Sequence, residues 1–167
     1  EHVWPAQHED CHRVAQSLLS SGKKLVLVGD SAGGMLASGL AVRAREDGFG
    51  DRILGQALIY PALGGDLNWP SYGQMANAPG LSTDDVIYYR DVLKAPMDDP
   101  FAHVLSVDDL RGLPPTYITA AYFDPLRDDG REFTAQLARA GIWVQYREEP
   151  QMIHGWLRAR HMSEGAK

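Results

Sequence analysis

Short apolar runs alternate with amphipathic stretches along the chain. The apolar runs predict strands over residues 25–28, 53–60, 116–121 and 142–146. The amphipathic or small-residue stretches predict helices over residues 5–20, 32–47, 83–93 and 126–140. Repeated alternation of strands and helices is typical of an α/β fold, in which helices cover a mostly parallel sheet and functional residues gather at the carboxyl ends of the strands.

Two of these elements carry expectations about burial. The run Leu-Val-Leu-Val at residues 25–28 has no polar position, which indicates a strand that is buried on both faces. In the helix over residues 5–20, apolar side chains at helical spacing form a stripe that we expect to face the core. This stripe consists of Cys11, Val14, Ala15, Leu18 and Leu19.

Residues 62–81 have no clear periodicity and are rich in Gly, Pro, Asn and Ser. Long irregular stretches inside compact domains are commonly lids or binding loops. We therefore expect residues 62–112 to contribute lid or cap segments to a single domain over residues 1–167. Four aromatic side chains of this region either line a substrate pocket or pack in the core. They are Trp69, Tyr72, Tyr88 and Tyr89.

The composition narrows the class of partner. The chain has 167 residues, of which 44% are hydrophobic and 23% charged, enough for one domain with a sizeable core. A net charge of -6 argues against a nucleic-acid partner and favours a small molecule. No apolar run reaches the roughly 18 residues that a membrane span needs. The single cysteine, Cys11, cannot form an internal disulfide, so we expect a cytoplasmic location, while assembly of identical copies stays open.

Residues 29–34 read Gly-Asp-Ser-Ala-Gly-Gly and lie between a predicted strand and a predicted helix. This arrangement predicts a tight elbow with Ser31 at its apex, where a base can reach the hydroxyl. We expect glycine at Gly29 and Gly33 because side chains two residues before and after the serine would collide. The backbone N–H of Ala32 is the oxyanion donor that this chain supplies.

Three turns at the carboxyl ends of predicted strands each carry one chemically useful side chain, namely Ser31, Asp124 and His154. A serine hydroxyl is a poor nucleophile at neutral pH, so it needs an imidazole to take its proton. The imidazole in turn needs a carboxylate that holds its tautomer and stabilises its charged form. The residue types that acyl transfer to a serine requires are therefore expected at one edge of the sheet.

The remaining polar residues have simpler explanations. Asp30 should make a structural hydrogen bond. Asp128 is either an acceptor behind the histidine loop or a first-turn helix residue stabilised by the helix dipole. The other histidines have no metal-ligand spacing, so we expect surface or capping roles and no metal site. These histidines are His2, His8, His12, His103 and His161.

Three segments occur in an informative order: Gly29-Asp30-Ser31-Ala32-Gly33-Gly34, Asp124-Pro125-Leu126-Arg127-Asp128-Asp129-Gly130 and His154-Gly155-Trp156. In this combination the chain resembles the hormone-sensitive-lipase-like carboxylesterases, also called family IV. The resemblance covers nearly the whole chain and implies an α/β-hydrolase fold, a three-layer sandwich around a mostly parallel sheet. It also implies hydrolysis of short-chain acyl esters without a cofactor, with Ser31 as nucleophile, Asp124 as carboxylate and His154 as base. Family members usually have Phe where Trp156 stands, which should alter packing and leave the chemistry intact. The family motif retains an acid at the position of Asp128, so the resemblance favours the role of Asp128 as an acceptor behind the histidine loop.

One feature of that family is absent from the sequence. Its members have a His-Gly-Gly-Gly segment upstream of the nucleophile, where backbone N–H groups complete the oxyanion hole, and no such segment precedes Ser31. The stretch Glu-His-Val-Trp-Pro-Ala at residues 1–6 instead resembles the segment that follows it in the family. We therefore expect the chain to hold the C-terminal portion of the fold, with a partial cap.

Other interpretations stay open. The gibberellin receptors share this fold and bind a hormone without hydrolysis, having lost the catalytic histidine, whereas His154 is retained here and favours an enzyme. A second alternative is an inert chain that lacks the oxyanion loop. Among enzymes, a deacetylase of a drug, sugar or antibiotic ester would differ in substrate and use the same mechanism.

Overall fold

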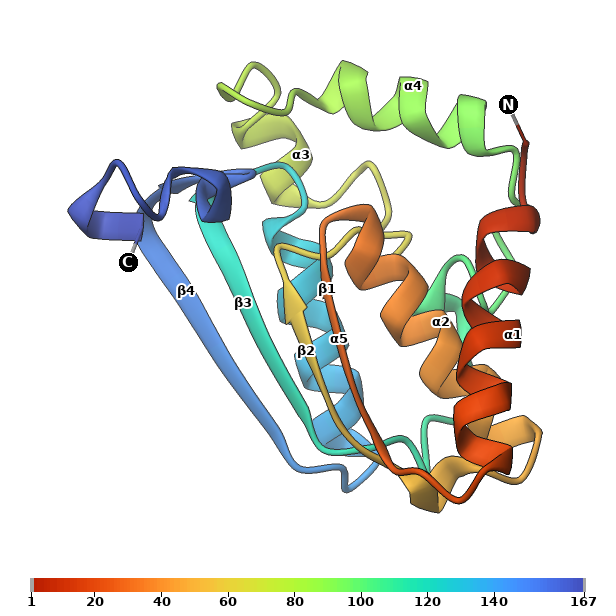
Figure 1. The fold of residues 1–167 in the computed structure, drawn as a ribbon. Coiled ribbons are helices and arrows are strands. Elements are labelled where there is room, and N and C mark those ends of the chain that lie inside the picture. The colour runs from red at the N-terminus through yellow and green to blue at the C-terminus, as the bar shows by residue number, and fades with distance from the viewer. Residues whose placement is uncertain (1, 167) are drawn as a thin grey trace.

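Four parallel strands form the sheet of the computed structural model, which describes residues 2–166 (Figure 1). The strands are β1 (Leu25–Asp30), β2 (Ile53–Ile59), β3 (Thr116–Phe123) and β4 (Val144–Ile153). Each strand pairs with the next one along the chain, so the order across the sheet is β1-β2-β3-β4. The four carboxyl ends consequently meet at one edge, which confirms the predicted parallel α/β architecture.

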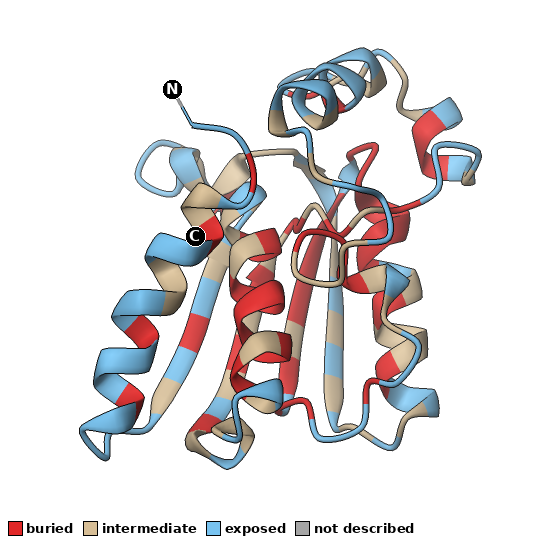
Figure 2. Cartoon of the chain, turned by 90° about the vertical axis from the view of Figure 1, so that its right-hand side faces the viewer, coloured by how far each residue is buried: buried red, intermediate tan, exposed pale blue. Residues whose placement is uncertain are grey.

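Three long helices cover one face of this sheet: α1 (Ala6–Ser20), α2 (Ala32–Glu46) and α5 (Arg127–Arg139). Right-handed crossovers between parallel strands that follow one another across a sheet bring the connecting helices to the same side. Figure 2 shows the three helices side by side in front of the sheet, with α2 in the middle. Within the described residues, no helix combines the length and the apolar character needed to cross a membrane.

The core lies between the sheet and these helices. Leu40 on α2, Leu58 on β2, Ile118 on β3 and Phe133 on α5 are buried in one apolar cluster. Full burial of a side chain of this kind stabilises the fold by about 1.5–3 kcal/mol relative to its exposure. The cluster therefore fixes the helices to the strands whose ends carry the polar residues described below.

The part of the opposite face that β1 and β2 form is exposed within residues 2–166, whereas Thr119 and Ala121 of β3 on that face are buried. Val26 and Val28 on β1 are 60% and 66% exposed, and Leu54 on β2 is 52% exposed. The prediction that residues 25–28 are buried on both faces is therefore wrong for the described chain, because side chains alternate between the two faces of a strand and only one face meets helices. The described residues thus supply the sheet and one helix layer of the expected three-layer sandwich.

The apolar stripe of α1 is narrower than predicted. Ala15 and Leu19 are buried, whereas Val14 and Leu18 are exposed and Cys11 is half-buried. Residues four apart lie above one another on a helix, so α1 packs on α2 along the line through Ala15 and Leu19. Val14 and Leu18 lie beside that line.

The strand β4 continues to Ile153, well past the predicted end at residue 146. Its second half contains charged residues and Pro150, which hid the strand from a search for apolar runs. Proline is tolerated here because β4 is an edge strand, where a missing backbone donor is less costly. The longer strand brings His154 directly to the carboxyl edge of the sheet.

Residues 62–112 include two α-helices, α3 (Pro70–Gln74) and α4 (Thr83–Leu93), and a 3-10 helix over Val104–Ser106. Figure 1 shows α4 lying across the top of the molecule, above the carboxyl ends of the strands. The hydroxyl of Ser82 caps α4, since it accepts a hydrogen bond from the Asp85 N–H at 3.1 Å. The short helix α3 was not predicted, because its Pro- and Gly-containing sequence has no helical period.

Candidate active site

The turn between β1 and α2 places Ser31 at a sharp corner of the chain. Ser31 has φ 54° and ψ -118°, a backbone conformation that residues other than glycine rarely adopt. The end of β2 holds this corner on both sides: the Ser31 N–H donates to the Ile59 carbonyl at 2.9 Å, and the Ala62 N–H donates to the Ser31 carbonyl at 3.2 Å. The serine is therefore fixed at the carboxyl edge of the sheet, as the elbow motif predicts.

Two glycines make this corner possible, and one of them differs from the prediction. A Cβ on Gly29 would lie 2.0 Å from the Gly33 carbonyl oxygen. A Cβ on Gly34 would lie 2.6 Å from the Cβ of Pro61. A Cβ on Gly33 would meet only a carboxylate oxygen at 3.9 Å, so the prediction that Gly33 must be glycine is wrong. The restriction falls on Gly34 because α2 begins so close to the β2 end that this residue touches Pro61.

The structure brings together the three residues predicted from the turns. The Oγ of Ser31 lies 2.8 Å from Nε2 of His154, and Nδ1 of His154 lies 2.7 Å from Oδ2 of Asp124. The Asp124 side chain is buried, and its Oδ1 accepts a hydrogen bond from the Leu126 N–H at 2.9 Å. Because the carboxylate accepts from Nδ1, the Nε2 atom is the acceptor that faces the serine hydroxyl. We call Ser31, His154 and Asp124 the Ser-His-Asp cluster.

Tyr60 was not predicted to belong to this site. Its ring centroid lies 4.8 Å from that of His154, and Trp156 packs edge-on against it at 5.9 Å. Its hydroxyl donates to Asp30 Oδ2 at 3.2 Å, which gives Asp30 the structural hydrogen bond expected of it. Burial, and secondarily the Asp30 carboxylate, raises the pKa of Tyr60 to about 12. The position of Tyr60 directly after a strand was the signal that could have identified it.

The acid Asp128 does not lie behind the histidine. Its Oδ2 accepts from the Ser71 N–H at 2.8 Å and its Oδ1 accepts from Arg131 at 3.0 Å, so it joins α3 to α5. The favoured prediction for Asp128 is therefore wrong. The first turn of α5 carries two consecutive acids, and both are used to hold the segment over residues 62–112.

The second of these acids, Asp129, is fully buried and was missed in the sequence. It accepts hydrogen bonds from the Tyr72 hydroxyl at 2.7 Å and from the backbone N–H groups of Leu63 and Gly65 at 2.9 and 3.1 Å. Burial raises the pKa of Asp129 above its ordinary value, and these donors oppose that shift. The contacts place Tyr72 in the core, which settles one of the four aromatic side chains left open above.

A cavity of about 440 Å³ opens over Ser31 and His154, and we call it the site cavity. Of the four aromatic side chains considered above, Tyr89 lines it, whereas Trp69 packs on a buried cluster and Tyr88 is exposed. The apolar part of its wall comes from Met35, Ala62, Leu81, Val86, Leu93 and Leu126. The remaining polar wall comes from Arg90, His103 and Arg158.

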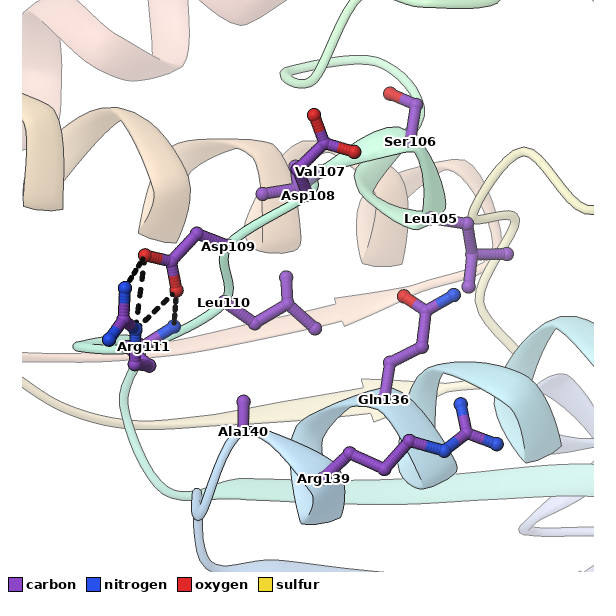
Figure 3. A pocket seen from close by; sticks show the side chains of 10 residues that line it. All are labelled: Leu105, Ser106, Val107, Asp108, Asp109, Leu110, Arg111, Gln136, Arg139 and Ala140. Carbon is purple, nitrogen blue, oxygen red and sulfur yellow. Dashed lines mark hydrogen bonds and ion pairs between the residues drawn. The ribbon is translucent and has the colours of Figure 1, made fainter.

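A larger hollow, of about 610 Å³, lies between residues 105–111 and α5 (Figure 3). Two of its charged groups bind each other, since Arg111 makes a two-pronged ion pair with Asp109 at 2.9 and 2.7 Å. The only serine among its lining residues, Ser106, donates its hydroxyl hydrogen to a backbone carbonyl. The hollow has no nucleophile beside a base, so the site cavity is the candidate active site.

The histidines outside the cluster differ in part from the prediction. His8 and His103 are buried, not surface residues, and burial lowers the pKa of each below its ordinary value. His12 lies 2.6 Å from Asp47 through its Nε2 atom. Within residues 2–166, no group of three or more His, Cys, Asp or Glu side chains is arranged to hold a metal ion.

Comparisons with known proteins agree with this fold. The sequence pattern of a family described as alpha/beta hydrolase fold matches residues 1–158. The chain is 33% identical to Esterase LipI and 34% identical to Carboxylesterase NlhH of Mycobacterium tuberculosis, over 94% of this chain in both cases and over 52% and 53% of those proteins. The chain therefore spans about half the length of the curated relatives it matches.

Solved structures give the same result. A bacterial heroin esterase superposes with a TM-score of 0.89 and 26% identity, over 99% of this chain and 56% of that chain. A thermostable esterase from Pseudomonas putida superposes with a TM-score of 0.91 and 26% identity, over 98% of this chain and 56% of that chain. Together with the parallel sheet and the elbow at Ser31, the match over residues 1–158 shows that this chain belongs to the α/β-hydrolase family.

Proposed function

We propose that the protein is a carboxylic ester hydrolase in which Ser31 is the nucleophile, His154 the general base and Asp124 the supporting carboxylate. The observation that carries this proposal is the unbroken contact series from the Ser31 Oγ through the imidazole to the buried Asp124 carboxylate, at 2.8 and 2.7 Å. Such a series activates a serine hydroxyl for attack on an acyl carbon. The names of the relatives, an esterase and a carboxylesterase, support the same reaction class.

The first half of the reaction forms an acyl-enzyme. The Ser31 Oγ bonds to the ester carbonyl carbon while its proton passes to Nε2 of His154. The tetrahedral intermediate then breaks the bond to the alcohol oxygen, which leaves with that proton. Asp124 keeps the imidazole oriented and stabilises its charged form, because the carboxylate is buried against Nδ1.

The second half releases the acid. His154 takes a proton from a water molecule, whose oxygen attacks the acyl carbon, and returns that proton to Ser31 as the acyl bond to Oγ breaks. In both halves negative charge develops on the carbonyl oxygen. The Ala32 N–H stabilises this charge, because Ala32 is the first residue of α2, where backbone N–H groups have no acceptor within the helix and the dipole is positive.

The cavity wall suggests the substrate class. Its mostly apolar lining and its volume of about 440 Å³ suit a short acyl chain. Gly80, Leu81, Val86 and Leu93 come from residues 62–112, so this segment acts as the lid or cap of the site. The contact between Ser31 and His154 favours hydrolysis over ligand binding alone.

The test is labelling of the protein with a fluorophosphonate, followed by peptide mapping, together with turnover of para-nitrophenyl butyrate. We expect the adduct on Ser31 and loss of both signals in Ser31→Ala and His154→Ala. A matched control is Ser106→Ala, whose serine lies in the other hollow and should leave both signals unchanged. An adduct on another serine, with Ser31 unmodified, would overturn the assignment.

A further inference from the structure

The site cavity has a charge pattern opposite to that of the whole chain. The chain carries 22 acidic and 16 basic residues. Yet the wall of the site cavity includes two arginines, Arg90 and Arg158, and no Asp or Glu side chain among the described residues. A cavity with cations and no carboxylates attracts an anionic ligand. The question is which of its basic groups is free to bind one.

Arg90 is already engaged by the protein. Its Nη2 donates to the Gly65 carbonyl at 2.9 Å and to the Tyr72 hydroxyl at 3.0 Å. The guanidinium also lies over the Tyr72 ring, 5.7 Å from its centroid, and close to the buried Asp129. Arg90 therefore holds the lid segment and balances a buried acid.

The histidines of the wall do not supply a permanent positive charge either. His103 is buried, and burial together with the nearby Arg90 lowers its pKa, so it is neutral at pH 7. His154 must accept a proton from Ser31 in the proposed reaction, so it begins each cycle neutral. Arg158 is consequently the basic side chain of the wall that remains to be explained.

Arg158 is exposed and lies on the turn Trp156–Ala159, which follows His154 directly. Its backbone N–H donates to the Gly155 carbonyl at 3.0 Å, which fixes the turn. Its guanidinium has no hydrogen-bond or ion-pair partner within residues 2–166, although the side chain lines the site cavity. An arginine in this situation presents planar donors that match a carboxylate or phosphate in a two-pronged contact.

We propose that Arg158 binds an anionic group on the substrate, and that the protein prefers esters whose alcohol half carries a carboxylate or phosphate. This inference rests on the proposed ester hydrolysis. The leaving alcohol receives its proton from His154, so it lies against the segment that carries this histidine. Arg158 is four positions further along that same segment and lines the same cavity as His154, so we assign the anionic group to the alcohol half.

The test compares para-acetoxybenzoate, whose alcohol half is anionic, with its neutral methyl ester. Because Arg158 is exposed to solvent, we expect Arg158→Gln to lower kcat/KM for the anionic ester by about fivefold, mainly through KM, and to leave the methyl ester nearly unchanged. Arg158→Glu should reduce turnover of the anionic ester further, and added salt should narrow the difference between the two esters. The control is Arg160→Gln, since Arg160 is on the same segment and does not line the site cavity.

A second pair of substrates tests whether Arg158 contacts the alcohol half or the acid half of the ester. Mono-para-nitrophenyl succinate carries its charge on the acid half and is compared with para-nitrophenyl pentanoate. The proposal for Arg158 would be overturned if Arg158→Gln lowered kcat/KM for the succinate ester alone. It would also be overturned if this variant lowered kcat/KM equally for charged and neutral esters. Failure of the proposed ester hydrolysis is distinguishable from failure of the proposal for Arg158, because in that case the unmodified protein would hydrolyse none of the four esters.

Discussion

The ring of Tyr60 lies against the imidazole of His154, with the ring centroids 4.8 Å apart, while the hydroxyl of the same tyrosine binds the residue that precedes Ser31. One buried side chain thus contacts both the segment of the proposed base and the segment of the proposed nucleophile. Tyr60 itself has a positive φ of 37°, so the chain is constrained at this point. We infer that Tyr60 positions the imidazole of His154 relative to Ser31.

The role of Tyr60 can be separated from simple packing. We expect Tyr60→Leu to lower kcat for para-nitrophenyl butyrate by about tenfold with little change in KM, because the imidazole loses the ring that orients it. Tyr60→Phe keeps the ring and should restore most of kcat. Steady-state kinetics well below the melting temperature of each variant provide the measurement. Equal kcat losses in both variants would show that the hydroxyl, and not the ring, is responsible.

The two acids Asp124 and Asp128 should respond differently to the same change. Asp124→Asn removes the carboxylate that accepts from the histidine, so we expect kcat to fall by about a thousandfold or more. Asp128→Asn should keep kcat within about threefold and lower the melting temperature, because Asp128 joins α3 to α5. Ester turnover and thermal denaturation, measured on both variants, show whether each acid acts in catalysis or in stability. A large kcat loss in Asp128→Asn would restore the interpretation that the structure rejects.

Alanine substitutions at the adjacent glycines Gly33 and Gly34 of the elbow should have opposite effects on folding stability. Gly34→Ala forces a Cβ to within 2.6 Å of Pro61, and such overpacking should cost about 1–3 kcal/mol of folding free energy. Gly33→Ala adds a Cβ on α2 that would make only an ordinary contact, with Asp30 Oδ1 at 3.9 Å, so it should be neutral or stabilising, by up to about 1 kcal/mol. Chemical denaturation of the two variants gives both values. A stable Gly34→Ala variant would mean that the end of β2 moves freely relative to α2.

The buried His8 predicts a pH dependence of stability. Its ring packs between Trp4 and Phe101, and burial lowers its pKa below the ordinary value of 6.5. As the pH falls through 6.5, the unfolded chain therefore binds a proton that the native His8 does not, so stability is lost on acidification.

We expect the melting temperature to fall between pH 7.5 and pH 5.5, and to fall less in His8→Phe. The remaining fall in His8→Phe is expected to come in part from His103, whose pKa is lowered in the same direction. A profile in His8→Phe as steep as that of the unmodified protein would contradict the assignment.

Local sequence pattern was sufficient to predict the four strands, the four longer helices and the convergence of Ser31, Asp124 and His154, although it missed α3 and the second half of β4. Each of these residues ends or follows a strand, and parallel strands bring their carboxyl ends together whatever the details of packing. The partners of other residues depend on packing between distant segments. Asp128 binds a residue 57 positions away, and the restriction on Gly34 comes from Pro61 on another strand end, so neither could be predicted from neighbouring residues.

The exposure of β1 and β2 on one face of the sheet in residues 2–166 was missed for a related reason. The composition of residues 25–28 shows that both faces of the strand are apolar, but the pattern contains no information on which element covers each face. For α1, likewise, the sequence pattern does not show which residues of the apolar stripe meet α2. In the structure Ala15 is buried and Val14 is exposed.

The strained backbone conformation of Ser31 lowers the stability of the fold, and a related chain that no longer needs this serine for hydrolysis could lose that strain. A residue with a side chain in this conformation costs roughly 1–3 kcal/mol, and glycine would adopt it without that penalty. Replacement of the serine by glycine would thus abolish the proposed chemistry and make the chain more stable at the same time. Descendants with this replacement would be more stable than their ancestor, so high stability in a chain of this kind is no sign that it still reacts with esters.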